Sequence, residues 1–203
     1  MTDAWYKAVG PRAKVTQGDL IFDCPLVGWA PDVPRLTGVS EIERLQAATQ
    51  VLAADVVVLT QACDLEHGKV SNVILCPHLA LADYRVAWNE EMARRAQNPS
   101  DKAWRAHCND IRDGYAWNLT MLSERDSGGM HIDHRIVDFH EVYTVPRIFL
   151  QSLLHRRKRH RLQLRAPYRE HLSQAFARFF MRVGLPVAVD DVWSTRSSSG
   201  TNP

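Results

Sequence analysis

The stretch that decides the fold is VVVLT at residues 56–60, an uncharged run of β-branched and aliphatic residues. β-branched side chains pack well on a pleated surface, so this run is typical of a buried strand. A polar turn at residues 66–69 separates it from a second apolar run, NVILC at residues 72–76. Two apolar runs around a short turn predict neighbouring antiparallel strands.

A helix is predicted on the amino-terminal side of this pair. Ser40 and Glu43 match a capping box, in which a serine hydroxyl and a glutamate each bond a free backbone N–H at a helix start. Ile42, Leu45 and Leu52 follow at helical spacing, so we expect an amphipathic helix over residues 41–54.

The carboxyl-terminal side alternates between helical and extended patterns. Residues 80–113 are helical in pattern with a break at 98–100, and Pro146 opens a short helix. An apolar stripe predicts a last helix over residues 167–183, ended by Gly184 and Pro186. A strand is expected at residues 136–145, and residues 123–134 form an expected polar loop.

These elements predict an α+β fold with a small, mostly antiparallel sheet, peripheral helices and a C-terminal amphipathic helix. A length of 203 residues fits one domain, placed at residues 1–193, and the serine-rich tail 194–203 is expected to be disordered.

Composition excludes several classes of protein. The chain is 45% hydrophobic and 24% charged, as globular domains are, and its net charge of +2 gives no overall attraction to nucleic acid or membrane. No run approaches the ~20 apolar residues of a membrane span, and the first residues do not resemble a signal peptide. We therefore expect a cytoplasmic protein without disulfides. Its widely spaced cysteines are Cys24, Cys63, Cys76 and Cys108.

A first candidate site follows the VVVLT strand. Cys63, Asp64 and His67 come directly after it, at the position where α/β enzymes often place a nucleophile. We take these three residues as candidate catalytic residues that line a pocket at the strand end.

A candidate metal site uses part of the same segment. Cys63 and His67, with Cys76 and His78 on the next strand, supply the two thiolates and two imidazoles that tetrahedral zinc accepts. The alternative is that Cys76 is an ordinary buried cysteine and that both histidines are solvated. We favour this alternative. The cofactor therefore stays unknown, and we expect no bound metal rather than zinc.

A third candidate is the basic run at residues 155–161. A row of cations on a turn can match a phosphate backbone, while a solvated turn is the plain alternative. The residues expected to contact phosphates are Arg156, Arg157, Lys158, Arg159 and Arg161.

Two further groups combine histidines with acids. His131 and His134 lie in the polar loop, and Asp138 and His140 lie on the expected strand at 136–145. A carboxylate beside an imidazole can perform acid–base chemistry, but a polar loop and an edge strand are the explanation that we favour for both groups.

Three segments resemble PemK/MazF-type toxins: GDLIF at 18–22, ADVVVLTQ at 54–61 and NVILCP at 72–77. The resemblance implies a partly barrelled, SH3-like sheet. The chain departs from the family at Asp55, where the toxins carry an arginine, and at Pro77-His78, where they carry Thr or Ser. Ribonuclease activity is therefore less strongly implied than the fold. The core followed by FFMRVGLP at 179–186 is also similar to uncharacterised bacterial proteins of mobile or defence gene clusters.

The leading hypothesis is a bacterial toxin-like or defence-system accessory protein. It would contact nucleic acid, or a protein encoded nearby, through the basic turn, with no membrane partner. One alternative is a metal-assisted hydrolase or nuclease that uses Cys63 and nearby histidines. Another is a protein-interaction module without a catalytic site, so whether the chain is an enzyme stays open.

Overall fold

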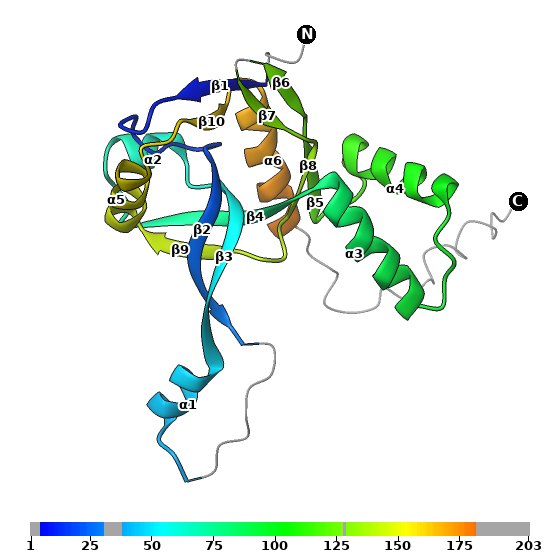
Figure 1. The fold of residues 1–203 in the computed structure, drawn as a ribbon, viewed down its shortest axis with the longest axis horizontal. Helices are drawn as coiled ribbons and strands as arrows, with labels where there is room; N and C mark the ends of the chain where they lie inside the picture. The colour runs from blue at the N-terminus through cyan, green and yellow to red at the C-terminus, as the bar shows by residue number, and fades with distance from the viewer. Residues whose placement is uncertain (1–4, 31–37, 128, 182–203) are drawn as a thin grey trace, which may run out of the picture.

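The structure is a computed structural model, and it describes residues 5–30, 38–127 and 129–181. Figure 1 shows helices placed around antiparallel strands. The helices in the described residues are α1 (Glu41–Ala48), α2 (Ala62–Glu66), α3 (Leu81–Arg94), α4 (Asp101–Asp113), α5 (Arg147–Arg157) and α6 (Tyr168–Phe180). The strands there are β1 (Tyr6–Val9), β2 (Leu20–Trp29), β3 (Thr49–Val58), β4 (Asn72–Ala80), β5 (Leu119–Leu122), β6 (Arg125–Ser127), β7 (Met130–Ile132), β8 (Arg135–Asp138), β9 (Tyr143–Pro146) and β10 (Arg161–Leu164).

All strand pairs in the described part of the chain are antiparallel. The main sheet has the order β2-β3-β4-β8-β5, and β9 pairs with the other end of β4. Two small sheets, β1-β10 and β6-β7, complete the set, and none of these sheets closes into a barrel. The predicted α+β class with a mostly antiparallel sheet is confirmed.

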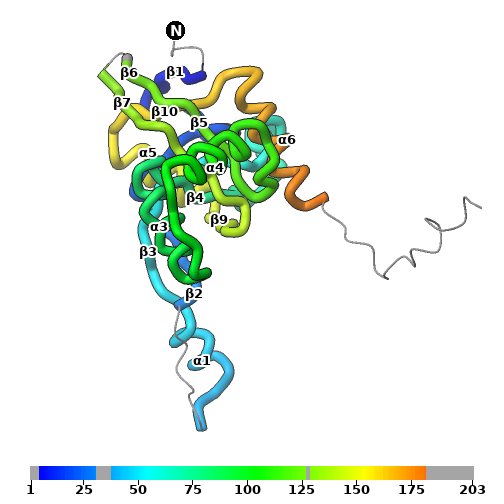
Figure 2. Tube along the Cα trace, turned by 90° about the vertical axis from the view of Figure 1, so that its right-hand side faces the viewer, coloured from blue at the N-terminus to red at the C-terminus, as the bar shows by residue number. Residues whose placement is uncertain are grey.

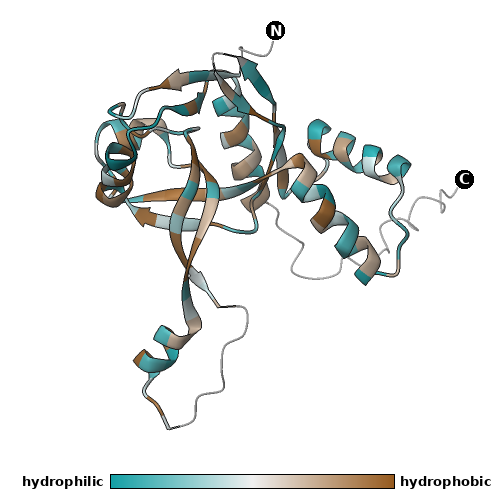
Figure 3. Ribbon diagram, in the orientation of Figure 1, coloured by the Kyte–Doolittle hydropathy of each residue, from teal (hydrophilic) through white to brown (hydrophobic). Residues whose placement is uncertain are grey.

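The VVVLT stretch is buried because its strand is covered on both faces. Val57 belongs to one core cluster, together with Leu20 of β2 and Leu172 of α6. Val56 and Val58 point the other way, into a second core cluster that α5 completes. Successive strand residues face opposite sides, so a strand with two buried faces needs an unbroken apolar run. In Figure 3 the apolar residues of β3 and β4 lie where these layers meet.

Helix α1 begins as predicted and ends early. The Ser40 hydroxyl accepts a hydrogen bond from the Glu43 amide at 3.3 Å, and the Glu43 carboxylate accepts one from the Ser40 amide at 2.8 Å. The helix stops at Ala48, so the prediction of helix over residues 49–54 is wrong. These residues instead pair with β2, where Leu52 lies opposite Leu26.

Strands β2 and β3 leave the body as a long two-stranded arm with α1 near its tip (Figure 1). β3 pairs with β4 only at residues 56–58, so residues 49–54 have β2 as their partner. Figure 2 shows the arm extending away from the other elements. The base of the arm contributes Cys24 and Leu26 to the second core cluster, whereas Val27, Trp29 and Val51 farther along it are exposed.

The expected strand at 136–145 is two strands. β8 pairs with residues 78–80 of β4 and β9 with residues 72–75, and the intervening chain turns back between them. The expected loop at 123–134 contains the β6–β7 hairpin. Both predictions were wrong because each segment finds its partner strand through the tertiary fold.

Helices α3 and α4, with the break between them, match the prediction, and so does α5 after Pro146. Helix α6 occupies the predicted last helix as far as Phe180. The expected stop at Gly184 and Pro186 and the expected tail 194–203 lie outside the described residues. None of the described helices is both long and apolar enough to span a membrane.

Candidate functional site

The basic run divides into buried and exposed residues. Arg161 begins β10 and is only 4% exposed. Its Nε donates to the Asp19 carboxylate at 2.9 Å, and its terminal nitrogens donate to three backbone carbonyls, those of Gly10, Ala13 and Lys14. All these donors are used inside the protein, so the prediction that Arg161 contacts a phosphate does not fit the structure.

The acid partner of Arg161 is buried as well. Burial raises the pKa of Asp19, while Arg161, Gln163 and the Thr16 amide oppose that shift. Gln163 donates to the second carboxylate oxygen at 2.6 Å. Asp19 and Arg161 therefore form a satisfied internal pair that holds the segment before β2 against β10.

Arg157 is also committed, although it is only half-buried. Its guanidinium donates to the backbone carbonyls of Phe22 and Asp23. The arginine thus ties the end of α5 to the bulge in β2. Its predicted phosphate contact does not fit this placement.

Arg156, Lys158 and Arg159 remain exposed where α5 ends. Arg12 and Lys14 join them, because the carbonyl bonds of Arg161 hold residues 10–14 beside the start of β10. A small pocket of about 170 Å³ lies at this junction and is lined by Arg12, Lys14 and His155. We call Arg12, Lys14, Arg156, Lys158 and Arg159 the basic surface.

Carboxylates do not neutralise the basic surface. No ion pair involves any of its five members among the residues that the structure describes. The exposed arginines elsewhere include several that do pair, such as Arg95 with Glu91 and Arg112 with Asp113. This surface is therefore an unpaired concentration of positive charge in a chain with a net charge of only +2.

The candidate catalytic residues lie on and after α2. Cys63 is exposed, with its sulfur 3.7 Å from a carboxylate oxygen of Asp64. His67 is the residue that ends this helix, and no hydrogen bond joins its imidazole to the thiol in the described structure. The geometry does not pair Cys63 with a base, so it gives no support to a nucleophile at this place.

The candidate zinc ligands are not brought together. Cys76 is buried, and its thiol lies 2.9 Å from the carbonyl oxygen of Asp138 and 3.3 Å from that of Glu141. His78 is 1% exposed, and its Nδ1 accepts a hydrogen bond from Arg135. Cys63 lies outside, on the surface of α2. The described residues contain no group of three or more histidine, cysteine or acidic side chains that could hold a metal.

The surroundings of these buried groups change their pKa values. Burial, with a smaller contribution from Asp138 and Glu141, raises the pKa of Cys76, so the thiol stays protonated. Burial and the neighbouring Arg135 lower the pKa of His78 to about 3. Both groups are neutral at pH 7, and a protonated Cys76 suits a hydrogen-bond donor better than a metal ligand.

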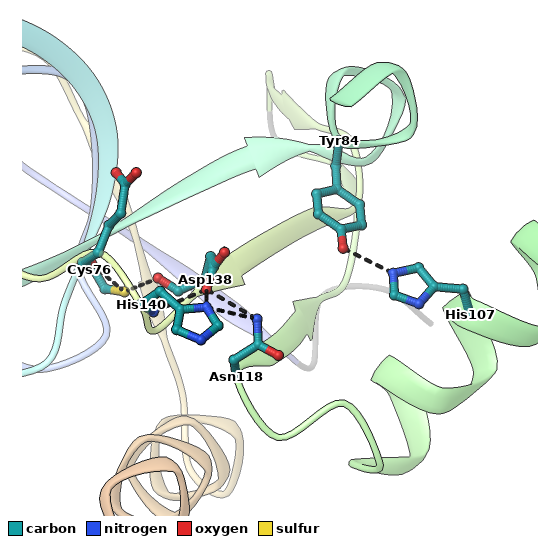
Figure 4. A network of polar contacts seen from close by, with 7 residues as sticks. Cys76, Tyr84, His107, Asn118, Asp138 and His140 are labelled. Atoms are coloured by element: carbon teal, nitrogen blue, oxygen red, sulfur yellow. Dashed lines mark hydrogen bonds and ion pairs between the residues drawn. The ribbon is translucent and has the colours of Figure 1, made fainter. Parts of the chain in front are cut away.

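A polar network surrounds the turn between β8 and β9 (Figure 4). One Asp138 carboxylate oxygen accepts from the His140 amide at 3.0 Å and from the Asn118 side chain at 3.3 Å, and lies 3.0 Å from His140 Nδ1. The sequence groups Asp138 with His140 but does not place them in contact, which the structure does. Because the same oxygen bonds a backbone amide two residues on, we interpret the network as the anchor of the turn.

The same view shows a second polar contact between two helices. The Tyr84 hydroxyl of α3 lies 2.9 Å from the His107 imidazole of α4 (Figure 4). Trp88 and Trp104 pack their rings against His107. This aromatic cluster joins the two helices.

A cavity larger than the one at the basic surface was not anticipated from sequence. It has a volume of about 540 Å³ and lies between the end of α4, strand β5 and helix α6. Its α6 wall consists of Tyr168, His171, Leu172, Ala175 and Arg178. Their spacing of three and four residues places them on one helix face. That stripe mixes apolar and cationic side chains. It was the one feature of the sequence that could have indicated a lined cavity beside this helix. We call this cavity the α4–β5–α6 pocket.

Comparison of the chain with protein-family models, with curated proteins and with solved structures finds no match.

Proposed function

We propose that the protein binds nucleic acid through the basic surface, by contacts with the phosphate backbone. The observation that carries this proposal is the set of exposed, unpaired cations at Arg12, Lys14, Arg156, Lys158 and Arg159. Contacts of this kind position a protein on the polymer and read no base sequence.

The setting of these cations favours a phosphate partner over simple solvation. Arg161 holds residues 10–14 beside the start of β10. Arg12 and Lys14 share a pocket lining with His155 of α5, so they lie beside the helix whose end carries the other free cations. A pre-assembled cluster does not have to be ordered on binding, so more of its attraction to an anionic polymer appears as affinity.

The proposal includes two finer assignments. The first is an SH3-like, partly barrelled core, supported by the sequential order β2-β3-β4 and by the register shift in β2 between Ile21 and Cys24. The second is a cytoplasmic toxin-like or defence-system accessory role, supported by the resemblance of the segments at 18–22, 54–61 and 72–77 to PemK/MazF-type toxins and of 179–186 to proteins of defence gene clusters. The structure provides no paired nucleophile at Cys63, so the proposed activity is binding.

The salt dependence of binding tests the proposal. We expect the substitution Arg156→Gln/Lys158→Gln/Arg159→Gln to flatten the plot of log affinity against log salt by about 2.7 units on duplex DNA, ~0.9 for each lost phosphate contact. The measurement is fluorescence anisotropy of a labelled random duplex, and of a labelled single strand, over about 50–200 mM salt.

A matched control removes three charges elsewhere. Arg94 ends α3, Arg95 follows it and Lys102 lies in α4, and all three are exposed. Their replacement by glutamine changes the net charge equally and should leave the slope close to that of the wild type. Thermal melts must show that the wild type and the basic-surface variant are both folded. If their plots of log affinity against log salt then coincide, nucleic-acid binding at this surface is refuted and a protein partner is favoured.

A further inference from the structure

We propose that the α4–β5–α6 pocket binds a small organic anion with a flat apolar body, such as an aryl phosphate or an aryl carboxylate. The site is separate from the basic surface: the pocket lies among α4, β5 and α6, whereas the basic surface lies at the end of α5 (Figure 1). Binding of nucleic acid and binding of this ligand can therefore be tested independently.

The size and walls of the pocket fit a compact apolar body. Its volume of about 540 Å³ lies within the ~300–1,000 Å³ range of small-molecule sites. Ile111, Leu119, Leu122 and Leu172 line it and are almost fully buried, between 2% and 6% exposed. A rigid apolar floor of this kind favours a ring system over a flexible polar chain.

Aromatic rings form one border of the pocket. Trp5 and Tyr168 stack on each other with ring centroids 3.9 Å apart and planes 15° from parallel. Both residues line the pocket. Stacked rings present flat apolar surface and edges, which suit contact with another ring.

The charge of the lining favours an anion. Arg112 is neutralised by Asp113, since two hydrogen bonds of 2.9 and 3.2 Å join the guanidinium to the carboxylate. Arg178 has no carboxylate partner among the described residues; its guanidinium packs over Trp117, 5.8 Å from the ring centroid.

The backbone leaves room for Arg178 to reach this place. Gly114 ends α4 with φ of +80°, and a Cβ built there would lie 2.9 Å from a terminal nitrogen of Arg178. The missing side chain lets the guanidinium lie against the end of α4, beside the pocket. One unpaired guanidinium next to an apolar cavity is the arrangement that recognises an acidic group on an apolar body.

The test uses four probes: 1-naphthyl phosphate, 1-naphthoate, neutral 1-naphthol and inorganic phosphate. Titration calorimetry with the wild-type chain should show that both aryl anions bind at least about tenfold more tightly than 1-naphthol, as a charge-assisted hydrogen bond predicts. Inorganic phosphate, which lacks the apolar body, should bind most weakly. The ratio between 1-naphthyl phosphate and 1-naphthoate distinguishes the two classes of anion.

Two variants locate the binding. Arg178→Gln should weaken both aryl anions about tenfold and leave 1-naphthol within about threefold, because only the charged contact is lost. Ala175→Phe places a ring in the cavity and should abolish binding of all three naphthyl compounds. Lys102→Gln, an exposed α4 charge outside the lining, serves as the control and should bind like the wild type.

The outcomes are decisive in both directions. Equal affinity of wild type and Arg178→Gln for the aryl anions would overturn the proposal, as would a wild type that prefers 1-naphthol. A thermal melt accompanies each variant. If Ala175→Phe fails to fold, the exposed Arg178→Gln variant still decides the matter.

Discussion

Arg161 and Arg156 lie in the same basic run, yet the structure predicts opposite results when each is replaced by methionine. Arg156 is exposed at the end of α5, whereas Arg161 is 4% exposed. Arg161→Met leaves the buried Asp19 carboxylate without its cation and removes one hydrogen-bond donor from each of the carbonyls of Gly10, Ala13 and Lys14.

The magnitude follows from the burial of both partners. Removing one member of a buried ion pair costs about 3–5 kcal/mol, because the other charge stays uncompensated. A substitution at an exposed position usually changes the free energy of unfolding by no more than about 0.5 kcal/mol. The total stability of a domain is typically about 5–15 kcal/mol, so Arg161→Met should remove a large share of it while Arg156→Met leaves it unchanged.

Urea denaturation followed by circular dichroism measures the difference. With a slope of ~2 kcal/mol per molar urea, Arg161→Met should lower the midpoint by about 1.5–2.5 M. Adding Asp19→Asn to Arg161→Met should recover part of the loss, since it removes the stranded charge. Equal midpoints for Arg161→Met and Arg156→Met would show that the buried pair does not support the fold.

Two further predictions concern buried groups. Under native conditions iodoacetamide should modify the exposed Cys63 and spare Cys24 and Cys76. Burial raises the pKa of Cys24 to about 11 and also raises the pKa of Cys76, so both thiols stay protonated and unreactive. Mass spectrometry of the labelled peptides checks this result. The fold lowers the pKa of His78 from 6.5 to about 3. Between pH 6.5 and about pH 3 the unfolded state therefore binds one proton more than the folded state does. The free energy of unfolding falls as the pH is lowered through this range, by at most about 1.4 kcal/mol per pH unit. His78→Asn, which keeps an acceptor for Arg135, should show a shallower decline in urea midpoint between pH 6.5 and 4, and an unchanged decline would contradict the burial of a neutral imidazole.

Several elements could be predicted from local sequence because local chemistry decides them. The capping box at Ser40 and Glu43 starts α1, since both bonds lie within one turn of chain. The apolar run at residues 56–60 is buried as predicted, because its side chains occupy both faces of the sheet. At the capping box the neighbours that matter are close in sequence. For the apolar run the composition alone indicates burial, although its core partners Leu20 and Leu172 are distant in sequence.

Residues 49–54 show where local sequence is insufficient. Their pattern suits either a continued helix or a strand, and propensity differences are small enough for tertiary contacts to override them. The presence of β2 alongside decides for the strand, with Val51 opposite Val27 and Leu52 opposite Leu26. The same dependence on a distant partner divides residues 136–145 into β8 and β9.

The sequence by itself determined the α+β class, the capped start of α1, the buried central strands and the existence of a basic run. Only the tertiary structure decided which cations of that run are free. β1 pairs with β10 and buries Arg161 against Asp19, while Lys158 and Arg159, a few residues away, stay in solvent. The α4–β5–α6 pocket likewise depends on segments that are distant in sequence. A side chain's chemistry is set by its type, but its exposure and its partners are set by contacts that chain folding alone creates.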